Sequence, residues 1–87
     1  MRVGVTEIGW EGSIRRRALD TWRLADADRW EHIIGQVLTL PPAYQATPGR
    51  PVYIIHTSDR AVLLGEEDLT GPVRDLVSTI LATGDPA

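Results

Sequence analysis

The chain has 87 residues, no cysteine and a formal net charge of -3 at pH 7. A chain of this length forms one domain with a modest core, and the lack of cysteine excludes disulfides, thiolate metal sites and cysteine nucleophiles. The acidic balance disfavours a nucleic-acid binder. Since no apolar run approaches about 20 residues and no basic-then-apolar leader is present, we expect a cytoplasmic protein without a membrane partner.

The first part of the chain predicts a β-hairpin. Residues 2–8 and 14–21 alternate as two strands. The turn between them consists of Gly9, Trp10, Glu11, Gly12 and Ser13, where the two glycines permit a positive φ. The three arginines at positions 15–17 alternate sides of the second strand, so they form no single basic patch. The inward face of this strand stays open at this stage, because the side chains at positions 14 and 18 compete with the one at position 19.

The next segment, from Asp26 to Leu40, predicts an amphipathic helix. Its apolar stripe recurs at helical spacing and consists of Trp30, Ile33, Ile34, Val37 and Leu38. Asp26 is a good N-cap, and Pro41 and Pro42 stop the helix. We expect this helix to be the packing centre of the domain.

The second half predicts another hairpin and another helix. A proline-rich loop at 41–51 leads into strands at 52–57 and 60–65, joined by a tight turn at Ser58 and Asp59. Thr70 then caps a helix whose apolar stripe runs from Val73 to Leu81 and which stops at residues 84–86. The order is ββαββα, which predicts an α+β fold with a four-stranded antiparallel sheet and two packed helices.

The second hairpin is apolar on both faces, whereas two helices can cover only one face of a sheet. We expect the other face to be covered from within, by the 41–51 loop or by Trp22. A second copy of the chain or a partner protein is the alternative. Trp10, at a hairpin tip, leaves two interpretations open: it folds back onto the sheet, or it anchors an interface.

The sequence offers no convincing catalytic or metal-binding site. His32 and His56 have no companion at ligand spacing, and the serines lack the context of an activated nucleophile. The acidic run at 66–68 is typical of a solvated turn before a helix. We therefore expect a protein without enzymatic activity, cofactor or bound metal.

Several short motifs taken together resemble the protealysin inhibitor (emfourin) family. They are the opening strand MRVGVTEIG, the turn GWEGSI followed by RRRALDT, the helix end VLTLPP, the strand PVYIIH and the closing DLTGPVRDLVSTIL. The resemblance covers nearly the full length and implies a single inhibitor domain at 1–87. It also implies inhibition of thermolysin-like zinc metallopeptidases by direct contact between the two proteins.

Exposure and turn chemistry, rather than the resemblance, indicate where such a contact would lie. The first candidate is the hairpin tip Gly9, Trp10, Glu11, Gly12 and Ser13. The second is the long loop, with Tyr44, Gln45, Thr47 and Arg50. The alternative hypothesis is a homodimeric structural or adaptor module that uses the second apolar face of the sheet. A nucleic-acid binder built on the arginines at 15–17 is the least favoured interpretation.

Overall fold

The computed structural model describes residues 1–39 and 48–87. The fold is α+β, with an antiparallel sheet and two helices, as predicted. The elements, in chain order, are β1 (Arg2–Ile8), β2 (Ile14–Asp20), the short 3₁₀ helix η1 (Thr21–Arg23), α1 (Ala27–Val37), β3 (Val52–His56), β4 (Ala61–Gly65), the 3₁₀ helix η2 (Glu66–Asp68), α2 (Gly71–Thr83) and β5 (Asp85–Pro86). Loop residues 41–47 and the expected helix end at Leu40 lie outside the described residues.

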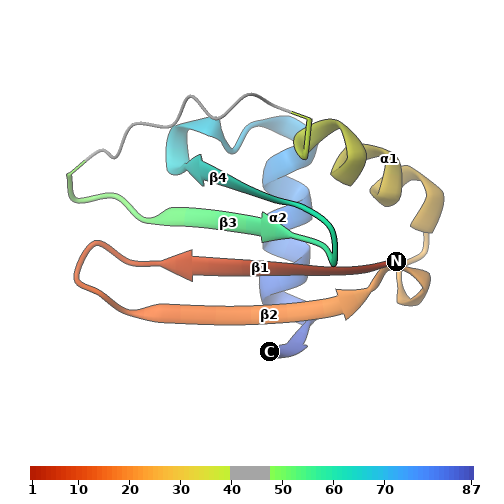
Figure 1. Cartoon of the computed structure of the whole chain (residues 1–87), viewed down its shortest axis with the longest axis horizontal. Coiled ribbons are helices and arrows are strands. Elements are labelled where there is room, and N and C mark those ends of the chain that lie inside the picture. The colour runs from red at the N-terminus through yellow and green to blue at the C-terminus, as the bar shows by residue number, and fades with distance from the viewer. Residues whose placement is uncertain (40–47) are drawn as a thin grey trace.

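The sheet has five strands where four were expected, in the order β4-β3-β1-β2-β5 (Figure 1). The additional strand is β5, which we expected to be only the stop signal of the second helix. After α2 ends at Thr83, with Gly84 as its C-cap, the chain returns along the edge of β2, where Asp85 pairs with Ala18 and Pro86 with Arg17. A proline has no N–H to donate, so an edge strand is the place in a sheet that tolerates it.

The register settles which face of β2 points inward. Leu19 pairs with Val3, and both are buried on the side of the helices. The same face carries Val5 and Ile55, which pair across β1 and β3. Strand alternation therefore places Arg15 and Arg17 on the helix side and Arg16 on the opposite face, together with Ile14 and Ala18.

The helix that packs on the strands is α2, whereas we expected the first helix to be the packing centre. α2 crosses the back of the sheet and contacts β1 and β2, whereas α1 packs mainly on α2 and η1 (Figure 1). Leu76 and Ile80 of α2 are completely buried. The prediction that the first helix is the packing centre is therefore wrong, because the apolar stripe of α2 lies directly over the strands.

The apolar stripe of α1 is nevertheless confirmed: Ile33, Ile34 and Val37 are buried, and Trp30 and Leu38 pack partly against the core. The capping predictions are wrong in detail. Asp26 and Thr70 occupy the N-cap positions, but neither side chain makes a capping hydrogen bond. None of the helices in the described ranges is long and apolar enough to cross a bilayer.

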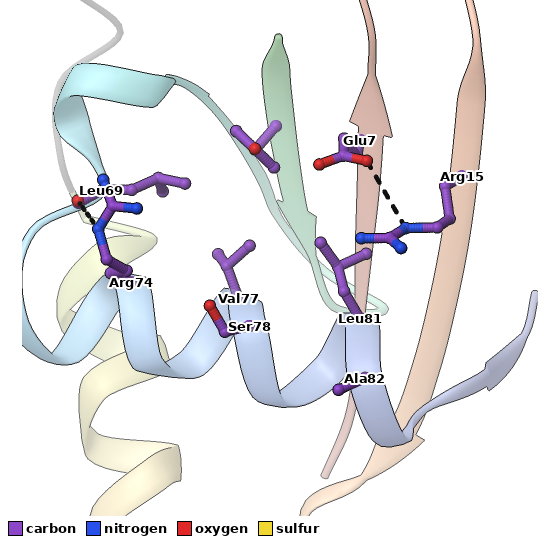
Figure 2. Close-up of a pocket in the computed structure, with 9 residues that line it drawn as sticks. Glu7, Arg15, Leu69, Arg74, Val77, Ser78, Leu81 and Ala82 are labelled. Carbon is purple, nitrogen blue, oxygen red and sulfur yellow. Dashed lines mark hydrogen bonds and ion pairs between the residues drawn. The ribbon is translucent and has the colours of Figure 1, made fainter.

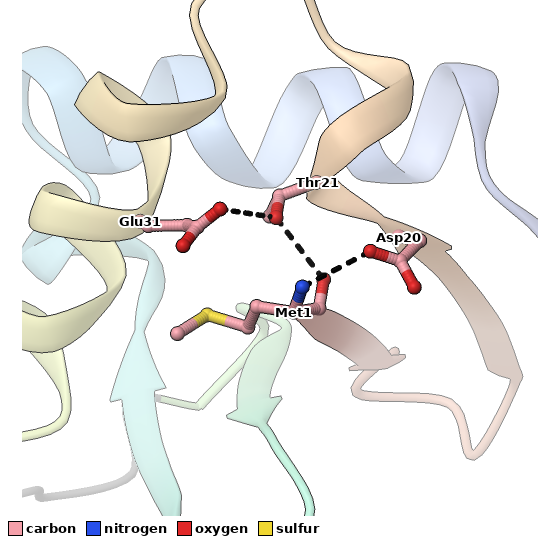
Figure 3. Close-up of polar contacts among 4 residues, drawn as sticks. All are labelled: Met1, Asp20, Thr21 and Glu31. Atoms are coloured by element: carbon pink, nitrogen blue, oxygen red, sulfur yellow. Dashed lines mark hydrogen bonds and ion pairs between the residues drawn. The ribbon is translucent and has the colours of Figure 1, made fainter.

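A polar contact ties the start of the sheet to α1. Thr21 is completely buried at the junction of β2 and η1, and its hydroxyl donates to Oε2 of Glu31 at 2.8 Å, with the Met1 carbonyl oxygen 3.2 Å away (Figure 3). The Thr21 backbone N–H also donates to that carbonyl, at 2.8 Å. This cluster fixes the start of β1, the end of β2 and α1 relative to one another.

Candidate functional site

The first candidate site is the turn that joins β1 to β2. Ile8 and Ile14 form the last strand pair, and the five residues between them close on themselves through two backbone hydrogen bonds. The Gly9 N–H donates to the Ser13 carbonyl oxygen at 2.8 Å, and the Gly12 N–H donates to the Gly9 carbonyl oxygen at 2.9 Å. Gly12 has φ +97°, a conformation that only glycine adopts without strain. The two hydrogen bonds and the conformation of Gly12 thus define the shape of the tip.

Two polar side chains fold over the start of this turn. The Ser13 hydroxyl donates to the Glu11 carboxylate, and both side chains occupy the space where a Cβ of Gly9 would lie. The hydrogen bond from Ser13, followed by one from the backbone N–H of Glu11, lowers the pKa of this exposed carboxyl group below its ordinary value. Glu11 therefore presents an oriented negative charge to solvent at neutral pH.

Trp10 projects from the tip. It is 59% exposed, so the interpretation in which it folds back onto the sheet is wrong. A rigid turn that displays an exposed tryptophan beside a carboxylate has the character of a protein-binding surface, because tryptophan is prominent among the residues that anchor interfaces.

The second candidate loop is only partly described: Tyr44, Gln45 and Thr47 lie outside the described residues, and Arg50 lies within them. Arg50 is exposed, and its Nη1 lies 3.1 Å from Oε1 of Glu66 in η2. Because Val52 pairs with Ile8, the start of β3 and the hairpin tip share one end of the sheet (Figure 1). The structure therefore brings the hairpin tip and the described part of the loop to the same end of the molecule.

The face of the sheet opposite the helices is a second exposed feature. Its larger apolar side chains are Ile8, Ile14, Val52, Ile54 and Leu63. Ile14 is 58% exposed and Leu63 42% exposed. Trp22 is itself 75% exposed, so the prediction that it covers this face is wrong. The expected cover from the long loop falls mostly on residues outside the described ranges.

Reasoning from the sequence missed a polar group beneath α2, close to the hairpin tip. Glu7, Arg15, Tyr53 and Arg74 line a pocket of about 300 Å³ between α2 and the sheet (Figure 2). Arg15 Nε lies 3.6 Å from Oε1 of Glu7. Burial, and then the hydrogen bond and negative charge of Glu7, raise the pKa of Tyr53 to about 12. The sequence contained one indication of this group. Strand alternation places Glu7 on the same face as Val3 and Val5, and a carboxylate is unusual on a face that points into the core.

The possibility of a metal site was also considered from the sequence. Among residues 1–39 and 48–87, no three histidine, aspartate or glutamate side chains lie close enough together to hold a metal ion. No family model, curated protein or solved structure matches the chain. The resemblance to the protealysin inhibitors therefore depends on the sequence motifs alone.

Proposed function

We propose that this protein inhibits thermolysin-like zinc metallopeptidases by inserting the β1–β2 hairpin tip into the active-site cleft. The observation that supports this most is the exposed Trp10 on a turn whose backbone is closed by its own hydrogen bonds. A binding segment that already holds its bound shape loses little conformational entropy on association, which favours tight inhibition. Inhibition of this kind requires no metal, cofactor or catalytic group from the inhibitor.

The side chains of the tip suggest how the block would work. Trp10 would fill an apolar part of the cleft, and its large surface would leave water there. The Glu11 carboxylate, oriented by Ser13, is an oxygen ligand of the type that zinc accepts. A catalytic zinc of this class keeps one coordination position for water or substrate, and an approaching carboxylate would compete for that position.

The test compares two exposed tryptophans in the same protein. Trp10→Ala should raise the inhibition constant about 30-fold or more, which corresponds to roughly 2 kcal/mol at an interface hot spot. Trp22→Ala is the matched control, because Trp22 is also exposed but lies in η1, beyond the opposite end of β2. Both variants should keep the wild-type melting temperature to within a few degrees. An inhibition constant that Trp10→Ala leaves unchanged would remove the tip from the site.

A second candidate function is supported by the open apolar face. The exposed Ile14 and Leu63 lie on the same face as three half-buried aliphatic side chains, an arrangement suited to a homodimeric structural or adaptor module. Sedimentation equilibrium should then show a dimer that Leu63→Glu dissociates, since a carboxylate buried in an apolar interface is costly. A monomer at high micromolar concentration would refute this alternative.

A further inference from the structure

The pocket beneath α2 combines an apolar floor with cationic ends. Val77 and Leu81 project from α2 toward the sheet, and Arg74 and Arg15 reach in from opposite ends (Figure 2). Its volume of about 300 Å³ stands at the small end of the range for ligand pockets, roughly 300–1,000 Å³. The pocket could hold a molecule of at least about ten non-hydrogen atoms, because ten water molecules at roughly 30 Å³ each would fill this volume.

The charges in the pocket are unevenly satisfied. Glu7 is engaged by the Arg15 guanidinium and by the Tyr53 hydroxyl, so its charge is compensated. Arg74 donates from Nε to the Leu69 carbonyl oxygen at 2.9 Å, which anchors the guanidinium. No carboxylate of the described residues lies within ion-pair distance of Arg74. Two carboxylates, those of Glu7 and Glu66, act on Tyr53, and each has another arginine as its ion-pair partner, Arg15 and Arg50 respectively. The positive charge without an ion-pair partner among the described residues therefore lies at Arg74.

A hydrogen-bond donor accompanies this charge. Ser78 lines the same pocket and follows Arg74 by four residues, so the two side chains are neighbours on one face of α2. An anchored guanidinium with an adjacent hydroxyl is a suitable pair of donors for a carboxylate. The apolar side chains of Val77 and Leu81, further along the pocket, would contact a short hydrocarbon body attached to it.

From this arrangement we propose that the pocket binds a small organic carboxylate with a short apolar body, its carboxylate at Arg74 and Ser78 and its body along Val77 and Leu81. Such a carboxylate has two sources, a free carboxylic acid and the carboxyl terminus of a peptide. The proposal does not depend on the inhibitor function, because the pocket lies on the helix side of the sheet and excludes the exposed tip residues.

The test titrates the ¹⁵N-labelled protein with 4-methylpentanoate, with N-acetyl-L-leucine and with the neutral N-acetyl-L-leucine amide, followed by heteronuclear NMR. We expect at least one acid to bind with a dissociation constant on the order of millimolar, as its small size allows, and to shift the amide signals of residues 74–81. The amide should bind at least tenfold more weakly. Preference for N-acetyl-L-leucine would assign the pocket to a peptide carboxyl terminus, and preference for 4-methylpentanoate to a free acid.

Variants decide whether the pocket is responsible. Arg74→Gln should weaken binding of the preferred acid at least tenfold, and Ser78→Ala, at an exposed position that leaves the fold intact, severalfold. Arg60→Gln, in the β3–β4 turn, is the control and should leave the affinity unchanged. Equal affinity for acid and amide, shifts confined to the open face of the sheet, or an affinity that neither Arg74→Gln nor Ser78→Ala reduces would overturn the proposal.

Discussion

The titration of Tyr53 is the most direct physical test of the polar group beneath α2. The burial of its phenol, and then the neighbouring Glu7 carboxylate, raise its pKa from the ordinary value of 10.0 to about 12. The chain has two tyrosines, so a Tyr44→Phe variant leaves Tyr53 as the only phenol in the ultraviolet titration. We expect half-ionisation near pH 12 while far-UV circular dichroism still reports a folded chain.

The same shift predicts how stability depends on pH. The unfolded chain loses this proton near pH 10, whereas the folded chain keeps it to about pH 12. Below pH 10 the stabilisation of the neutral phenol is fully present, and it is lost as the pH rises from about 10 to 12. A shift of about two pKa units corresponds to at most roughly 2.7 kcal/mol, and we expect about 1–2 kcal/mol because the pocket is open to solvent.

Two variants connect this effect to its cause. In the wild type the free energy of unfolding, measured by urea denaturation at each pH, should fall between about pH 10 and 12. In Tyr53→Phe this fall should be absent. Glu7→Gln removes the negative charge and should move the pKa of Tyr53 back toward 10. A Tyr53 that ionises near pH 10 in the folded protein would contradict the burial of its phenol beside Glu7.

Three further substitutions test the core, the buried polar contact and the tip. Ile80→Ala, at a completely buried position of α2, should reduce the free energy of unfolding by about 2–5 kcal/mol in urea; a loss below about 1 kcal/mol would contradict the packing of α2 on the sheet. Thr21→Val keeps the side-chain volume but removes the hydroxyl that binds Glu31, and should cost about 1–2 kcal/mol, so an unchanged denaturation midpoint would count against that hydrogen bond. Gly12→Ala should cost about 1 kcal/mol and lower the melting temperature by several degrees, because φ +97° strains any residue with a Cβ; a neutral result would show that the turn has another shape.

The elements that depend on local periodicity were predictable from the sequence. Alternation located β1 to β4, and the 3.6-residue stripe located both helices with their buried residues. Boundaries were less accurate. α1 ends at Val37 with Leu38 as its C-cap, short of the expected helix end at Leu40, and β2 ends at Asp20, one residue before the expected end at position 21.

Features that depend on the three-dimensional arrangement were not predictable. β5 has only two residues and exists because α2 delivers the chain to the edge of β2, which no local pattern encodes. The inward face of β2 was ambiguous because the competing aliphatic side chains have similar apolar character, and only pairing with β1 decides it. Arg74 lines the same pocket as Glu7 and Tyr53, although Glu7 and Arg74 are 67 positions apart in the sequence. Residue spacing does not reveal that the fold brings them together.

The measurement that tests the proposed function most directly is a titration of the purified protein against a thermolysin-like protease that hydrolyses a fluorogenic peptide. The account predicts that activity falls in proportion to added protein and is lost at one equivalent, while the hairpin tip stays uncleaved by mass spectrometry. Full activity of several such proteases at a large excess of the protein would contradict the inhibitor proposal.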